Sequence, residues 1–94
     1  MSIGRIESAI TRDEMRVVVG WGDGRRAEIN LAGIAAAHPA LSPLADPDIF
    51  HRIRVSDDGW SLEWPNCGID FGSAQLRSWA DEQAGEAMRA DFRA

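Results

Sequence analysis

The sequence contains no lysine, one cysteine and no long apolar run, and each absence excludes a class of protein. Without lysine there is no Schiff-base nucleophile and no P-loop, since both depend on a lysine amine. A lone Cys67 cannot build the disulfide framework of a small secreted domain, which indicates a reducing compartment. No stretch approaches the roughly 18 apolar residues that suggest a membrane span, and the first ten residues lack the apolar core of a signal peptide. We therefore expect a cytoplasmic protein that does not bind membranes.

Positive charge is scarce as well. The basic residues, all arginine, number ten against fifteen acidic ones, which gives a formal net charge of −5. Binding to phosphates requires concentrated positive charge, and the only adjacent basic pair is Arg25 and Arg26. We therefore expect no direct contact with nucleic acid. A length of 94 residues predicts a single domain, 1–94, with a small core.

The apolar residues alternate like β-strands on both sides of a glycine-rich turn. Odd positions are apolar from 15 to 21, and the alternation resumes after the turn. A three-residue loop, 22–24, sets Val19 opposite Ala27, whereas a two-residue loop would mix the polar and apolar faces. We predict the three-residue loop, with Gly24 left-handed in a G1 bulge.

A second hairpin is predicted over residues 53–64. Pairing Val55 with Leu62 keeps the apolar side chains on one face, and this register fits a type I′ turn at Asp58-Gly59 or a four-residue loop. Trp60 and Trp64 would then share the face of Leu62.

Helix signals occupy the remaining segments. Asn30 can cap a helix over 31–37, Asp46 can cap a single turn, and Ser73 can cap a long helix from 74 to about 92. Residues 69–71 can add a short last strand. The predicted fold class is α+β: two antiparallel β-hairpins joined by short helical turns, with a C-terminal helix packed on the sheet.

The apolar stripe of the C-terminal helix is longer than the sheet it has to cover. Nineteen helical residues span about 28 Å, whereas a strand of five or six residues spans roughly 17 to 20 Å. We therefore expect a homodimer in which this helix, and not the sheet, forms the interface. The predicted dimer contacts are Ala84, Ala87 and Met88.

Four motifs in order carry a family resemblance: WGDGRRAEINL, LADPDIFHRIRV, GWSLEWPNCGID and AQLRSWADEQ. Together they resemble the small bacterial domain-of-unknown-function family numbered 2442, from about residue 6 to residue 83, which leaves 84–94 as the end of the C-terminal helix. The resemblance implies a compact α+β domain. Similar domains occur alone, fused ahead of a helix-turn-helix, or encoded beside another small protein in arrangements that look like toxin–antitoxin pairs.

Three residues are candidate partner contacts. Trp21 and Trp60 lie at strand ends beside turns, where an exposed tryptophan would anchor a partner, although the alternation favours a place in the core for both. Asp70 is the third, because the resembling family carries an aspartate there; the alternative is a cap for the loop and the helix start.

No catalytic, metal or cofactor site is predicted. His38 and His51 are only two candidate ligands, and zinc requires three or four. Cys67 is a lone thiol, and Asp57 and Asp58 are adjacent in a solvated turn, where carboxylates make poor acid–base catalysts.

The expected function is therefore non-catalytic. We expect a protein-interaction domain, the antitoxin-like or accessory half of a two-protein module whose partner is another small protein encoded nearby. The alternative is a regulatory domain that acts with DNA through a separate helix-turn-helix chain.

Overall fold

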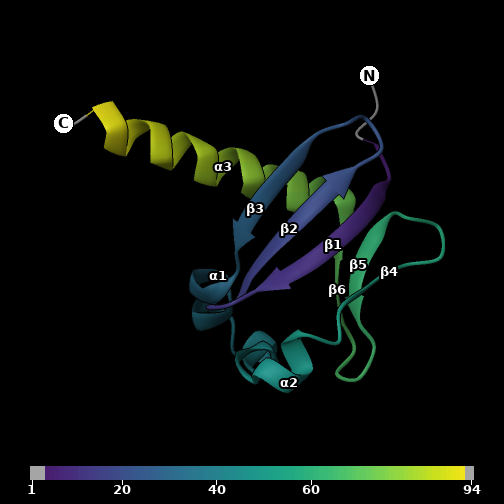
Figure 1. Ribbon diagram of the computed structural model, residues 1–94. Coiled ribbons are helices and arrows are strands. Elements are labelled where there is room, and N and C mark those ends of the chain that lie inside the picture. The colour runs from purple at the N-terminus through teal and green to yellow at the C-terminus, as the bar shows by residue number, and fades with distance from the viewer. Residues whose placement is uncertain (1–3, 93–94) are drawn as a thin grey trace.

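The computed structural model describes residues 4–92, and side chains within residues 4–85. Its architecture is two three-stranded antiparallel sheets with short helices between them and one long helix at the end (Figure 1). In chain order the elements are β1 (Ile6–Arg12), β2 (Arg16–Trp21), β3 (Arg26–Asn30), α1 (Ala32–Ala37), the 3₁₀ helix η1 (Pro39–Ala45), α2 (Pro47–Phe50), β4 (Arg54–Val55), β5 (Ser61–Trp64), β6 (Ile69–Gly72) and α3 (Ser73–Phe92). The predicted α+β fold class is confirmed.

Sheet A has the strand order β1-β2-β3, and its β2–β3 hairpin has the predicted register. Val19 pairs with Ala27, and the loop between the strands has three residues. The Trp21 N–H donates to the carbonyl of Arg25, and the Gly24 N–H donates to the carbonyl of Trp21. Gly24 has φ +93°, the left-handed conformation of a G1 bulge.

Strand β1 extends the first hairpin to three strands. It runs from Ile6 to Arg12 and pairs antiparallel with β2. The turn that follows holds Glu14 at φ +64° and Met15 at φ +61°. Non-glycine residues pay a conformational cost in this region, so the β1–β2 turn is a strained point of the fold.

Sheet B has the order β4-β5-β6 and the predicted pairing of Val55 with Leu62. The type I′ turn is wrong: the Ser56 N–H donates to the carbonyl of Ser61, which closes a four-residue loop over 57–60. Gly59 has φ +77°, and a Cβ there would lie 3.0 Å from Cβ of Arg5. The four-residue loop therefore also needs glycine at position 59.

In the connector between the sheets, α2 begins where the sequence predicts, whereas α1 begins at Ala32, one residue after the predicted start, with Leu31 at its N-cap and no side-chain cap. Oδ1 of Asn30 accepts the N–H of Ala32 at 2.9 Å, and Oδ1 of Asp46 accepts the N–H of Asp48 at 2.9 Å. Asp46 is thus the predicted N-cap of α2, whereas the Asn30 carboxamide bonds an amide from the position before the N-cap of α1 and is not its cap.

The core lies between the sheets, the connector and α3. Aromatic rings link these elements: Phe50 of α2 stacks on Trp64 of β5, and Phe71 of β6 contacts both Trp64 and Trp79 of α3, with ring centroids 4.9 to 5.9 Å apart. The indole N–H of Trp64 donates to the carbonyl of Phe50 at 2.9 Å, so the polar edge of this buried ring is satisfied.

Helix α3 crosses behind sheet A, and its C-terminal part extends past β3 (Figure 1). The helix begins at Ser73 itself, one residue earlier than predicted. The Ser73 hydroxyl does not serve as the predicted cap. Instead it accepts the indole N–H of Trp21 at 3.0 Å and donates to the carbonyl of Gly4 at 3.1 Å, which joins the helix start to sheet A.

We predict that Gly24→Val lowers the free energy of unfolding by about 1 to 3 kcal/mol, because a β-branched side chain resists positive φ. A Cβ at Gly24 would have no other atom within 4 Å, so the loss comes from backbone strain alone. Gly24→Asn is the matched control, since asparagine tolerates this conformation and should cost less. Urea unfolding measures both, and equal stability of wild type and Gly24→Val would contradict the bulge.

Candidate interaction sites

Trp60 is a large exposed apolar residue on a turn that its own main chain holds in place. It is 44% exposed, whereas the sequence pattern had placed it on the core face with Leu62. The Trp60 N–H donates to Oδ1 of Asp58 at 3.0 Å, and its carbonyl accepts the Ser73 N–H at 2.8 Å. The ring is therefore presented to solvent from a fixed backbone, which lowers the entropic cost of binding.

Arg5 completes this site, and no pattern in the sequence had pointed to it. Its guanidinium carbon lies 5.6 Å from the centroid of the Trp60 ring, within cation–π range. The neighbouring Ile6 N–H donates to the carbonyl of Gly59 at 2.7 Å, which fixes the start of β1 beside the turn. Arg5 is remote from Trp60 in sequence, so only the fold brings the pair together. We call Arg5 and Trp60 the Trp–Arg site.

Asp58 organises the turn below Trp60. Its Oδ1 accepts the Ser56 hydroxyl at 2.7 Å as well as the Trp60 N–H. The Ser56 hydrogen bond, followed by the Trp60 N–H, lowers the pKa of Asp58 from its ordinary value of 3.8. Asp58 therefore acts as a turn-stabilising carboxylate, and its lowered pKa suits a permanent acceptor better than a proton donor.

Trp21 is buried, at 2% exposure, and does not face solvent as a partner contact would. Arg77 covers its ring, with the guanidinium carbon 5.0 Å from the ring centroid, and Nη2 of Arg77 donates to Asp23 at 2.8 Å. Trp21 therefore stabilises the contact between sheet A and α3. Its buried position is not that of a partner contact.

The other predicted contacts lie on β6 and α3. Asp70 is exposed on β6, opposite Glu63, and its position within the strand does not fit the alternative role of a helix-start cap. Ala84 is exposed on α3. Ala87 and Met88 fall in the helix but outside the residues whose side chains the structure describes.

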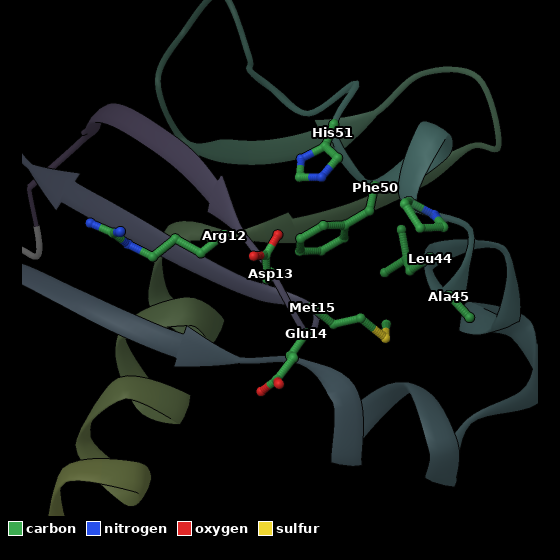
Figure 2. Close-up of a pocket in the computed structure, with 9 residues that line it drawn as sticks. Arg12, Asp13, Glu14, Met15, Leu44, Ala45, Phe50 and His51 are labelled. Carbon is green, nitrogen blue, oxygen red and sulfur yellow. The ribbon is translucent and has the colours of Figure 1, made fainter.

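A small cavity of about 160 Å³ lies between the β1–β2 turn and the connector. Figure 2 shows Phe50, Leu44 and Met15 around it, with the side chains of Arg12 and Glu14 directed away from its middle. His51 is at its rim, hydrogen-bonded to Thr11. The walls are mainly apolar, and the polar groups near the Phe50 ring are those of Asp13 and His51 (Figure 2), so the cavity offers little to orient a polar substrate.

Two kinds of site are absent from the part of the chain that the structure describes. No three His, Cys, Asp or Glu side chains in that part come together as a metal site. Within residues 4–92, no helix combines the length and apolar character that a bilayer span requires.

The outer face of sheet A gathers positive charge that the overall composition hides. Arg12 pairs with Arg16 across β1 and β2, and Arg26 of β3 lies opposite Gly20, so the three arginines share one face. Glu28 lies among them, with Oε1 3.3 Å from Nη1 of Arg16 and Oε2 3.5 Å from Nε of Arg12. We call Arg12, Arg16 and Arg26 the arginine face; no motif in the sequence indicates it, because its members lie on three strands.

The comparisons with known proteins agree with the family resemblance. The sequence model of the family described as "Protein of unknown function (DUF2442)" matches residues 6–82. The chain belongs to this family. No curated protein matches it.

One similar solved structure is the crystal structure of the "Putative DNA Binding Protein" NE0471 from Nitrosomonas europaea ATCC 19718. The sequences are 28% identical, the TM-score is 0.74, and the match covers 90% of this chain and 56% of the other. This chain therefore spans little more than half of that protein. The expectation of no direct nucleic acid is corrected by this neighbour, because net charge was its main basis and a protein of the same fold is named for DNA binding.

We predict that Ser56→Ala raises the pKa of Asp58 toward 3.8, because it removes the main cause of the lowered value. The folded-state pKa lies below the unfolded one, so the ionised carboxylate stabilises the fold at pH values above about 4 and this contribution disappears as pH falls through the folded pKa. An NMR titration of the Asp58 carboxyl carbon measures the shift. Ser61→Ala is the control, and an unchanged pKa in Ser56→Ala would refute the assignment.

Proposed function

We propose that this chain is a non-catalytic protein-interaction domain that holds its partner through the Trp–Arg site. The observation that carries the proposal is that the Trp60 ring is half-exposed while the main-chain N–H and C=O groups of Trp60 are both hydrogen-bonded. Exposed Ile10 is the other large apolar residue of this kind among the described side chains, but it lies on the arginine face without a comparable turn.

The chemistry of the site favours a protein over a small molecule. Tryptophan and arginine are enriched among the residues that dominate protein interfaces, because each offers a large contact area and a directed polar group. The ring projects from a turn and lies at the surface, so it would enter a pocket on the partner. Family membership is compatible with an accessory role in a two-protein module, in which a second small protein supplies that pocket.

We predict that Trp60→Ala removes partner binding while the fold persists. Truncating such an anchor typically costs at least ~2 kcal/mol of binding, or a Kd increase of roughly 30-fold. The loss of folding stability should stay below about 1 kcal/mol, since Trp60 lies outside the buried core and its cation–π pair with Arg5 is at the surface.

The experiment is affinity capture from the native cell followed by titration of the captured protein. Ile10→Ala is the matched control, because it removes a comparably exposed apolar side chain elsewhere. A partner bound equally by wild type and Trp60→Ala would exclude the Trp–Arg site.

A second candidate function is regulation at DNA, which the Nitrosomonas europaea neighbour favours. Two routes are compatible with it. The arginine face could contact phosphates directly, or the chain could act through a separate helix-turn-helix chain that it binds. The net charge of −5 opposes the first route at long range, so any direct contact would rest on local charge at the arginine face.

We predict for the direct route that duplex binding weakens steeply with salt and that Arg26→Ala reduces the slope of log K against log salt by about 1, the amount for one phosphate contact. Fluorescence anisotropy with a labelled duplex measures this. Arg54→Ala, which removes an arginine from sheet B, is the control and should leave the slope unchanged. If the purified chain does not bind DNA even at low salt, or if both variants act alike, the arginine face is not the contact surface.

A further inference from the structure

Strand β3 is an edge strand whose outward main-chain groups can be assigned from its neighbours. The Leu31 N–H and the Arg25 carbonyl both bond toward β2, whereas the main-chain N–H and C=O of Asn30 both point away from it. Because the direction alternates along a strand, the N–H and C=O groups of Glu28 and Arg26 also point outward.

Helix α3 closes this edge at one place and leaves the next residues open. Gln83, the one polar interruption of the helix's apolar stripe, accepts the Asn30 N–H at 2.8 Å and donates to the Asn30 carbonyl at 2.9 Å. Its carboxamide thus occupies the edge as a paired residue would. Within the described part of the chain, no such hydrogen bond reaches the outward groups of Glu28 or Arg26.

The open part of the edge is accessible. A groove of about 480 Å³ runs between β3 and α3 and is lined by Arg26, Glu28, Asn30, Gln83 and Ala84. An exposed edge with free main-chain groups is a template for a further strand. The open edge of β3 should therefore either pair with a further strand or carry a feature that prevents such pairing.

We propose that the occupant is β3 of a second copy, paired antiparallel about a two-fold axis at Ala27. In this register Arg26 of each copy lies opposite Glu28 of the other, and both pairs exchange main-chain hydrogen bonds. The two symmetric alternatives place Arg26 opposite Arg26 or Glu28 opposite Glu28. Like charges directly opposite each other destabilise a strand pair, so the charges select the first register.

The same arrangement gives a physical reason for the position of Gln83 and for the small residue at the axis. Gln83 ends the free edge at Asn30, which limits pairing to the short segment centred on Ala27. Ala27 faces α3 with a single methyl group, so the strands can meet at the axis without a bulky side chain. Two-fold pairing of one self-complementary surface is the commonest route to a homodimer. This inference is independent of the Trp–Arg site.

Charge reversal tests the register directly. Light scattering of the full chain at tens of micromolar should give a dimer, and Arg26→Glu or Glu28→Arg should each weaken it about tenfold or more, because both cross-strand pairs become like-charged. Mixing the two variants should restore a dimer, since each interface pair then joins Glu and Arg again. The double variant Arg26→Glu/Glu28→Arg should also recover.

The controls separate this interface from other causes. Arg54→Glu makes the same charge change on sheet B and should leave the dimer unchanged. Glu28→Arg also breaks the ion pairs with Arg12 and Arg16, so if it fails to fold, Arg26→Glu alone decides the result. A monomeric wild-type chain would overturn the proposal. A dimer that Arg26→Glu does not weaken would also overturn the proposal and would favour the C-terminal helix as the dimer interface.

Discussion

The fold depends on the hydrogen bonds of one buried polar residue, Ser73, at the start of the long helix. It is 3% exposed, so an unsatisfied hydroxyl there would cost free energy comparable to a lost hydrogen bond or more. Its hydroxyl bonds Trp21 of sheet A and the carbonyl of Gly4, while its N–H donates to the carbonyl of Trp60 beside sheet B. One residue thus fixes α3 against both sheets, and its main-chain bond fixes the carbonyl of Trp60.

The position of Trp60 follows from that arrangement. Its carbonyl is held by Ser73 and its N–H by Asp58, and the four-residue loop removes it from the strand whose alternation would have buried it. A ring held at the surface in this way loses little freedom when it binds, which is the physical basis for assigning it an interaction role. The buried Trp21, on the same network, shows the opposite outcome: its indole N–H found an internal partner.

The sequence was sufficient for the strand registers because each is a choice between few alternatives, and it placed the helix starts to within one residue, although neither Asn30 nor Ser73 acts as the predicted cap. A one-residue slip moves every side chain to the other face, so the pairing of Val19 with Ala27 and of Val55 with Leu62 followed from apolar alternation. The Trp–Arg site could not be predicted in the same way from apolar alternation. Loop length decided whether Trp60 was buried, two turn lengths satisfied the same register, and the contact with Arg5 arises only when β1 lies beside the second hairpin.

The net charge was a poor guide to nucleic-acid binding because positive charges are concentrated on one face of the molecule. A total of −5 describes the average field of the molecule, which salt screens beyond a Debye length of about 10 Å at 0.1 M, whereas a contact surface acts over a few ångströms. Alternation places Arg26 and Glu28 on the same face of β3, and pairing adds Arg12 and Arg16 from β1 and β2. Three positive charges around one negative charge can attract phosphate locally in an acidic protein. The short segment from Arg26 to Glu28 also carries one charge of each sign at the open edge of β3, so its sequence suits antiparallel pairing with a second copy. If a second copy is bound at this edge, Arg26 and Glu28 face each other across the interface, and fewer of these charges remain free to contact another partner.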